Sequence, residues 1–453
     1  MRSDGPPSDP FAPARSGSVP PERVIIGRGL WGGRLQSVEV GIGPEGDIVR
    51  VGRNVTGGER HDVGEALILP SATDLHVHFR DPGGPKDLET FETGTLQAAL
   101  GGVGLVGDMP NTQPAVTDLE RLESKAARAR GHLAVGAFLY GAALTTSGVR
   151  RLSGQAAAFK LYLSPTTSIA EPPLDPGLRP LLEAVAATGL ALSVHAELPE
   201  RFVVDPARTP SNPVEWNRAR PDRSELDAVE KILAICPPGL RLHFAHLSVP
   251  AAVDRVRLAG HSAEATPHHL LLAARDGGTA REKVNPPLRS EPEREELWTR
   301  FRRGSPPIVA SDHAPHDPDD KEKAFYLAPS GMPGVETMVP LLLERVRAGE
   351  LELVDLLRAA CDRPARWIGA PHGRLAPGHR ANLIVVDFRK RTRLAARHLH
   401  APCGWTAFEG WEAIFPIEHY RDGRPIVRDG EFVGDLHGAL LRPEYAPGRA
   451  AGA

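Results

Sequence analysis

Two histidines separated by one residue, His76 and His78, are the strongest chemical signal in the chain. On a β-strand this spacing directs both imidazoles to the same face. Imidazole is the commonest protein ligand for metal ions, so the pair supplies half of a metal site. An isolated pair of this kind also arises at polar strand ends, so the rest of the chain must decide between the two explanations.

Further metal-competent residues lie at or near the ends of other short apolar runs. Catalytic groups occupy such positions in a barrel of parallel strands. A single buried histidine is usually a packing residue, but several at the same end of successive strands are hard to explain by packing. Nitrogen and oxygen ligands without sulfur suit zinc, manganese or another borderline divalent ion. The predicted metal-binding residues are His76, His78, Lys160, His195, His246 and Asp312.

Lys160 needs a separate argument, because a protonated ammonium has no lone pair and cannot bind a metal. An ordinary lysine would pack its stem and extend its charged end to solvent. Lys160, however, precedes alternating apolar residues inside an apolar run. Burial beside two cations would favour the neutral amine. A neutral amine can add carbon dioxide, and the resulting carbamate offers one oxygen to each of two metal ions.

The composition narrows the class of protein. The chain has 453 residues, a net charge of −3 and a sequence pI near 6.7, which does not suggest a nucleic-acid partner. Three scattered cysteines favour neither a disulfide framework nor a thiolate zinc site. No apolar run reaches the roughly 18 residues of a membrane span. These features predict a soluble cytoplasmic enzyme that does not bind membranes.

The elements that must position these residues alternate along the chain. Eight strand-like runs separated by helical patterns predict an α/β protein with a (β/α)8 TIM barrel. A doubly wound open sheet is the alternative. Helices are expected over 88–100, from a capping box at 117–120 to Gly131, over 227–235, and from 290. The strand-like runs are the segment carrying His76, then 102–110, 132–138, 158–163, 190–195, 242–246, 262–266 and 307–312.

Both flanks of this pattern contain short β runs broken by glycines. We expect residues 23–66 and 374–436 to join into one small β-sandwich domain, with the barrel over 67–373. Residues 1–22 and 437–453 are rich in small and polar residues and predict disordered tails.

The motifs together resemble the metal-dependent amidohydrolases, and within them the dihydroorotases, over roughly residues 23–436. Residues 159–163 (FKLYL) are similar to the carboxylated-lysine form found in the dihydroorotase domain of the animal multifunctional pyrimidine enzyme. The other matching motifs are 76–83 (HVHFRDPG), 109–114 (MPNTQP), 266–270 (TPHHL), 285–289 (NPPLR), 311–316 (SDHAPH) and 333–338 (PGVETM).

The resemblance implies a reaction and a role for each metal-binding residue. His76, His78 and Asp312 would hold one metal ion, His195 and His246 a second, and a carbamate on Lys160 would bridge the two, which are expected to be Zn2+. Asp312 would also act as general acid and base. The reaction would be the reversible cyclisation of N-carbamoyl-L-aspartate to L-dihydroorotate, with loss of water, in de novo pyrimidine (UMP) biosynthesis. A homodimer and an association with aspartate transcarbamoylase are compatible with the resemblance.

The resemblance also implies substrate contacts, which would be made by Arg80, Asn111, Asn285, His316 and Gly331. Arg80 could instead form an ion pair with Asp81 or Asp87. Thr166 and Thr167 lie where relatives have a lid, although a polar surface turn explains them nearly as well. The remaining histidines of the motifs, His268, His269 and His313, are expected to be structural. Ala245 replaces a cysteine of some relatives, which argues against an additional cysteine-bound metal.

Two other functions fit part of the pattern. An allantoinase or hydantoinase would share the fold and the metals, but Arg80 and Asn111 suit an acidic substrate. An inactive scaffold that binds aspartate transcarbamoylase would have lost metal ligands, whereas this chain keeps all six residues. Dihydroorotase is therefore the favoured prediction.

Overall fold

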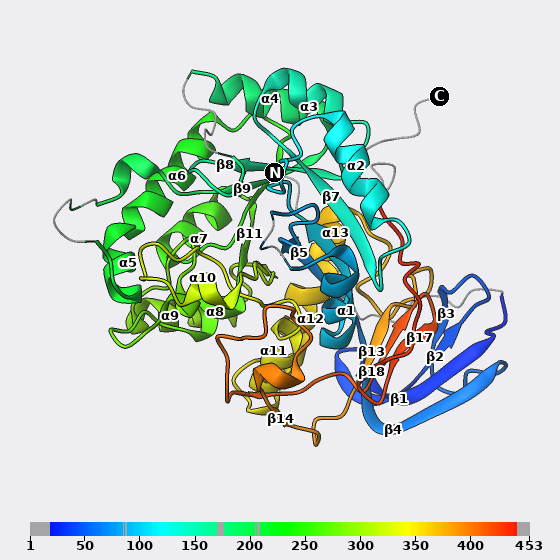
Figure 1. The fold of residues 1–453 in the computed structure, drawn as a ribbon. Helices are drawn as coiled ribbons and strands as arrows, with labels where there is room; N and C mark the ends of the chain where they lie inside the picture. Colours follow the sequence, from blue (N-terminus) through cyan, green and yellow to red (C-terminus); the bar gives the residue numbers. More distant parts are fainter. Residues whose placement is uncertain are drawn as a thin grey trace.

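The computed structural model describes residues 19–84, 86, 88–169, 176–203, 205 and 209–441. Two eight-stranded sheets dominate it, one forming a barrel and one a separate layer beside the barrel (Figure 1). Within the described residues, no helix has the length and hydropathy required to cross a membrane. The tail expected over 1–22 lies outside the described residues except for its last four.

The barrel is built from eight parallel strands that pair in sequence order. A further parallel bridge, between Val77 and His313, brings the chain that follows the last strand beside the first strand. The sheet is therefore nearly closed, which confirms the predicted (β/α)8 barrel and rejects the open sheet. The strands are β5 Ala72–Val77, β6 Val103–Asp108, β7 Gly136–Ala142, β8 Ala158–Tyr162, β9 Ala191–His195, β10 Arg241–Phe244, β11 Ser262–Ala265 and β12 Ile308–Val309.

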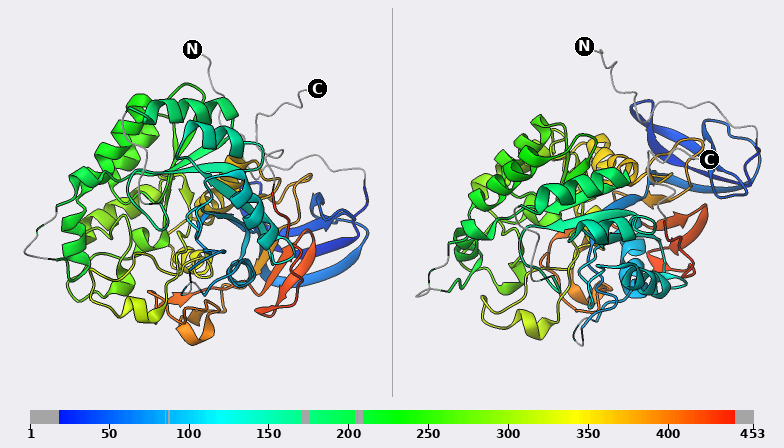
Figure 2. Two further views of the ribbon diagram at one scale, coloured as in Figure 1. Left: turned by 45° about the horizontal axis from the view of Figure 1, so that its top comes forward. Right: turned by 90° about the horizontal axis from the view of Figure 1, so that it is seen from above.

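Helices surround the barrel and cover its outer face (Figures 1 and 2). They are α1 Phe91–Gly101, α2 Leu119–Ala129, α3 Thr146–Leu152, α4 Leu178–Thr188, α5 Pro213–Ala219, α6 Asp222–Ile235, α7 Pro250–Leu258, α8 Pro267–Leu271, α9 Glu291–Phe301, α10 Pro318–Lys321, α11 Met338–Arg347, α12 Leu353–Leu357 and α13 Arg363–Ile368. A π-helical segment, Arg358–Asp362, joins the last two. Short 3₁₀ turns occupy Pro199–Arg201, Ala280–Glu282 and Ala396–His398.

The helix ends follow local signals in the sequence. Helix α1 ends at Gly102, whose φ of 83° is accessible to glycine without a steric penalty. The capping box at the start of α9 forms between Ser290 and Glu293. The expected box at 117–120 is wrong by one residue. Asp118, not Thr117, is the N-cap of α2, because its carboxylate accepts the backbone N–H of Arg121.

The third barrel strand was predicted four residues too early. The apolar side chains of the run 132–138 are buried, but Leu133 pairs with the C-terminal segment instead of with a barrel strand. Its backbone N–H donates to Leu436 O at 3.0 Å, and its carbonyl accepts the Gly438 N–H at 2.7 Å. The disordered tail expected from 437 is therefore contradicted over 437–441, because these residues pair alongside β7. Residues from 442 lie outside the described part.

The second sheet combines both ends of the chain in the order β18-β17-β16-β13-β4-β1-β2-β3. Figure 2 shows the N-terminal strands (blue) and the C-terminal strands (red) together at one side of the barrel. The strands are β1 Arg23–Trp31, β2 Arg34–Ile42, β3 Ile48–Gly52, β4 Glu59–Pro70, β13 Leu383–Val386, β16 Glu418–Arg421, β17 Arg424–Arg428 and β18 Glu431–Phe432, and a separate pair is formed by β14 Thr392–Arg393 and β15 Glu412–Ala413.

Strand β4 determines where the small domain ends. Its last residues pair with β13, as in the register of Leu69 with Ile384, and Ile68 lies in the core of this sheet. The boundary expected between residues 66 and 67 falls inside β4. We place it after Pro70, since β5 begins at Ala72.

Candidate active site

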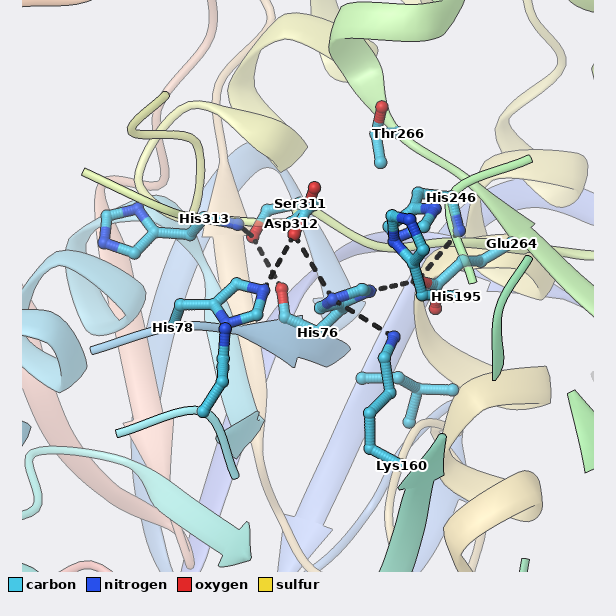
Figure 3. A network of polar contacts seen from close by, with 12 residues as sticks. His76, His78, Lys160, His195, His246, Glu264, Thr266, Ser311, Asp312 and His313 are labelled. Carbon is cyan, nitrogen blue, oxygen red and sulfur yellow. Dashed lines mark hydrogen bonds and ion pairs between the residues drawn. The ribbon is translucent and has the colours of Figure 1, made fainter. Parts of the chain in front are cut away.

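Five of the six residues predicted to bind metal lie at the carboxyl ends of barrel strands, and Lys160 lies in the middle of its strand. His76 and Lys160 are in β5 and β8, and His195 is the last residue of β9. His78, His246 and Asp312 follow β5, β10 and β12 within three residues. Figure 3 shows their side chains converging from these different strands. The closed barrel thus brings together residues up to 236 positions apart in the sequence.

His76, His78 and Asp312 form the first group. One Asp312 oxygen, Oδ1, lies 3.2 Å from His76 Nε2 and 3.1 Å from His78 Nε2. All three residues are buried, and their potential ligand atoms lie within 4.8 Å of one another. Two imidazoles and a carboxylate at this spacing form a donor set that suits a divalent metal ion.

His195 and His246 form the second group. His195 Nδ1 lies 3.0 Å from His246 Nε2, and the two rings are 4.7 Å apart between centroids. The His246 ring is also 5.1 Å from that of His76, so the two groups adjoin. The fully buried Lys160 extends from β8 toward them and places Nζ 3.5 Å from His76 Nε2 (Figure 3).

Three of the four histidines are oriented by a hydrogen-bond partner on the ring nitrogen that points away from the proposed metal centre. His76 Nδ1 contacts Glu264 at 2.6 Å, and His78 Nδ1 contacts Asn111 Oδ1 at 2.7 Å. His195 Nε2 contacts Glu197 at 3.1 Å. Metal-binding histidines are typically oriented by such partners. The nitrogens that remain, Nε2 of His76 and His78 and Nδ1 of His195, face the centre.

Protonation states also fit a metal centre. Burial, with Lys160 nearby, lowers the pKa of His76 to about 4, and burial lowers that of His195. Burial and the neighbouring His195 hold the pKa of His246 well below its usual value. These three rings are neutral at pH 7, as metal ligation requires. Burial by itself raises the pKa of Asp312, but His76, His78 and His246 together bring it well below its usual value, so the carboxylate is ionised.

Lys160 is suited to carboxylation. Its side chain is completely buried, and burial lowers the pKa of its ammonium to about 8, although Glu264 and Asp312 oppose the shift. A minor but larger than usual neutral fraction is therefore present near neutral pH, and only the neutral amine can attack carbon dioxide.

A cavity of about 230 Å³ opens over this centre. It is lined by the four histidines and Asp312, whereas Lys160 lies beneath them. All the residues expected to contact substrate, and both residues of the expected lid, also line it. These are Arg80, Asn111, Thr166, Thr167, Asn285, His316 and Gly331.

Arg80 is held rigidly at the cavity wall. It has a positive φ of 52°, its guanidinium donates to Pro315 O, and Nη2 lies 3.1 Å from His316 Nε2. Asp81, one of its two alternative partners, instead pairs with Arg128. The other, Asp87, lies outside the described residues.

Backbone strain gathers at this site. Non-glycine residues rarely adopt a positive φ, because the side chain then approaches the backbone closely. Arg80, His246 and Asp312 have φ values of 52°, 36° and 48°. Each directs a polar side chain toward the same cavity from a strand end, as strained residues at functional sites often do.

Sequence reasoning missed the residues that orient the histidines. Glu264 contacts His76 Nδ1, lies 2.9 Å from His243 Nε2, and accepts the backbone N–H of His246 at 3.2 Å. Glu197 holds His195 and accepts two hydrogen bonds from Arg220. An isolated glutamate inside the apolar run 262–266 was the available signal for Glu264.

The histidines expected to be structural lie outside the cavity lining. His269 contacts Thr266 Oγ1 at 2.8 Å and Pro286 O at 2.9 Å. His313 pairs with Glu89 and accepts the backbone N–H of Gly334. These contacts account for both rings without a metal ion.

The sequence model of the amidohydrolase family matches residues 67–412 of the chain. A dihydroorotase of Halobacterium salinarum is 35% identical over 384 residues, covering 83% of this chain and 89% of the relative. A dihydroorotase of Archaeoglobus fulgidus is 33% identical and covers 91% of this chain and 99% of the relative.

Solved structures show the same fold in related enzymes. An L-hydantoinase (dihydropyrimidinase) from Arthrobacter aurescens superimposes with a TM-score of 0.84 at 23% identity, covering 93% of this chain and 99% of that chain. A D-hydantoinase from a Bacillus species gives a TM-score of 0.81 at 23% identity, with 92% and 98% covered. At this identity the agreement concerns the fold alone.

Proposed function

The chain belongs to the amidohydrolase family, and from this premise we propose that it is a dihydroorotase. The reaction implied by this resemblance is the interconversion of N-carbamoyl-L-aspartate and L-dihydroorotate, and relatives that cover most of the chain carry the name dihydroorotase. The observation that carries the proposal is the cavity in which Arg80 and His316 line the same space as five metal-competent residues. A fixed guanidinium beside a metal centre suits a cyclic amide that bears a carboxylate.

The centre is proposed to hold two zinc ions, one by His76, His78 and Asp312 and the other by His195 and His246. Lys160 would bridge them after its neutral amine forms an N–C bond to carbon dioxide and loses a proton, which yields a carbamate. When bound, two such ions polarise the substrate carbonyl and lower the pKa of a water molecule. The histidine orientations and the lowered pKa of Lys160 support this assignment.

Asp312 is proposed to move the proton. In hydrolysis the ring C–N bond breaks, the water oxygen joins the carbonyl carbon, and the ring nitrogen gains a proton. The Asp312 carboxylate lies on the cavity wall and is ionised, so it can accept the proton of the water and deliver it to that nitrogen. Cyclisation follows the same steps in reverse.

Arg80 and Asn111 are proposed to bind the substrate carboxylate, with Asn285, His316 and Gly331 completing the contacts. Asn111 uses Oδ1 for His78, which leaves its Nδ2 to donate. That Nδ2 lies 3.5 Å from Thr166 Oγ1. Asn111 thus connects a metal-binding histidine, the substrate space and the proposed lid formed by Thr166 and Thr167.

Hydantoinase is the second candidate, because such an enzyme would share the fold and the metal centre, and hydantoinases are among the solved structures that superimpose well. Arg80 weighs against it, since a neutral ring needs no guanidinium. The test is to measure hydrolysis of dihydroorotate, allantoin and a phenyl-substituted hydantoin by the purified protein. Hydrolysis of dihydroorotate well above the other two is expected, and a preference for either of the others would refute the proposal.

The proposed enzyme acts in the cytoplasm in de novo synthesis of UMP. Assembly as a homodimer and association with aspartate transcarbamoylase are further predictions. Size-exclusion chromatography of the protein, alone and mixed with that enzyme, tests both. A scaffold without activity would be expected to lack bound metal.

A further inference from the structure

Two buried lysines lie close to the active-site cavity without taking part in the metal centre. Lys283 follows the 3₁₀ turn Ala280–Glu282, and Lys321 ends α10 (Figure 1). Their side chains are nearly inaccessible, with residue exposures of 3% and 2%. Among the residues that the structure describes, neither ammonium has a carboxylate within ion-pair distance. Burying a charge in this way is costly unless hydrogen bonds compensate.

Backbone carbonyls of one loop supply that compensation. Lys283 Nζ donates to Phe325 O, Tyr326 O and Ala328 O at 2.9, 2.9 and 2.7 Å. Lys321 Nζ donates to Pro329 O and Gly331 O at 2.9 and 2.8 Å. The loop also donates one backbone hydrogen bond to Lys283, from the Gly331 N–H to Lys283 O at 2.8 Å. Five carbonyls between residues 325 and 331 thus point at two ammonium groups.

The end of this loop forms part of the cavity wall. Pro329, Ser330 and Gly331 line the cavity, and Ser330 O lies 2.8 Å from His316 Nε2. Gly331 has a φ of 133°, and a Cβ added there would lie 2.6 Å from Ala314 O. The Gly331 backbone therefore packs directly against Ala314, with no space for a side chain. The position of the wall is set by the lysines on one side and by His316, the neighbour of Arg80, on the other.

We propose that Lys283 and Lys321 are positioning residues for substrate binding, whose amino groups hold the loop 325–331 and so fix the cavity wall formed by its last three residues. The inference rests on the proposed function for the identity of the substrate. Within residues 324–331 the backbone forms only a turn, in which the N–H groups of Leu327 and Ala328 donate to Ala324 O. The two lysine amino groups add the hydrogen bonds that hold the rest of the loop in place. Their removal loosens the wall beside Arg80 and His316 and leaves the metal-binding residues in place.

The test compares Lys321→Met with Lys323→Met. Methionine retains the apolar stem but not the ammonium. Lys323 is half-exposed, lies two residues along the chain and pairs only at the surface with Asp320 in the described structure, so it is the matched control. Unsatisfied buried carbonyls predict a KM for dihydroorotate about tenfold higher in Lys321→Met. We expect kcat within about twofold of wild type, unchanged metal content, and a control that behaves as wild type.

Hydrogen–deuterium exchange supplies a second readout that does not depend on substrate. Peptides covering 324–332 should exchange faster in Lys321→Met while those covering the barrel strands do not change. Unchanged KM and unchanged exchange in the folded variant would overturn the inference. The inference would also be overturned if both Lys321→Met and Lys283→Met failed to fold or lost stability across the whole protein. If wild-type protein does not hydrolyse dihydroorotate, the proposed function fails, and exchange still decides whether the lysines fix the loop.

Discussion

At the scale of single residues, the candidate metal centre is ordered by atoms that face away from it. Glu264, Asn111 and Glu197 each hold one ring nitrogen of a histidine and leave the other for the centre. The six central residues could be predicted because five of them lie at the ends of apolar runs and the sixth, Lys160, is a lysine inside one. Asn111 was expected at the site only as a substrate contact, and the orienting roles of Glu264 and Glu197 were not predicted, because these roles depend on side-chain contacts formed in the folded barrel.

Replacing Asp312 by asparagine separates catalysis from folding. The change keeps the size of the side chain and one oxygen but removes the base, so we expect kcat to fall by about 10²- to 10⁴-fold. Melting temperature and metal content should stay close to those of wild type. If Asp312 served only to stabilise the backbone that follows it, Asp312→Asn would lower the melting temperature and leave kcat intact.

Replacing Arg80 by methionine tests recognition of the substrate carboxylate. Removing one partner of a desolvated charged contact costs about 2–5 kcal/mol, so KM for dihydroorotate should rise strongly while the metals are retained. Arg121→Met, at an exposed position of α2, is the control. An unchanged KM in Arg80→Met would mean that the carboxylate binds elsewhere.

At the scale of elements, the strand ends and the helices behind them are joined by buried polar contacts. Glu225 in α6 accepts the backbone N–H groups of Ser248 and Val249, just before α7. The bonds link two helices beside the strand that leads to His246. Burial raises the pKa of the Glu225 carboxyl to about 7, against the opposing effects of Arg289 and these hydrogen bonds.

This raised pKa predicts a pH-dependent stability. Between the ordinary glutamate pKa of about 4.5 and the folded value of about 7, the folded protein binds more protons than the unfolded chain. The contribution of Glu225 to stability therefore falls as pH rises through this range. Glu225→Gln should remove that loss, which amounts to about 1–3 kcal/mol. Urea unfolding of both proteins at pH 5 and pH 7.5 measures it, and an identical pH dependence would contradict the assignment.

At the scale of the whole molecule, the number and order of apolar runs were enough to predict the barrel. The apolar runs did not predict which segments pair with one another, because an apolar run shows that a segment is buried but not what it contacts. Residues 133–135 are buried beside the C-terminal segment, and β4 continues to Pro70 within the second sheet. Both differences arise from pairing between residues about 300 positions apart, as with Leu133 and His437.

We propose a metal-dependent dihydroorotase in which a carbamate on Lys160 would bridge two metal ions. The most direct measurement is elemental analysis of the purified protein together with its rate on dihydroorotate, with Lys160→Ala measured in parallel. The account predicts two divalent ions per chain in active wild type, and loss of both metal and activity in Lys160→Ala, partly restored by short carboxylic acids. Fully active wild-type protein containing only trace metal, or a Lys160→Ala variant with near wild-type rate, would contradict it.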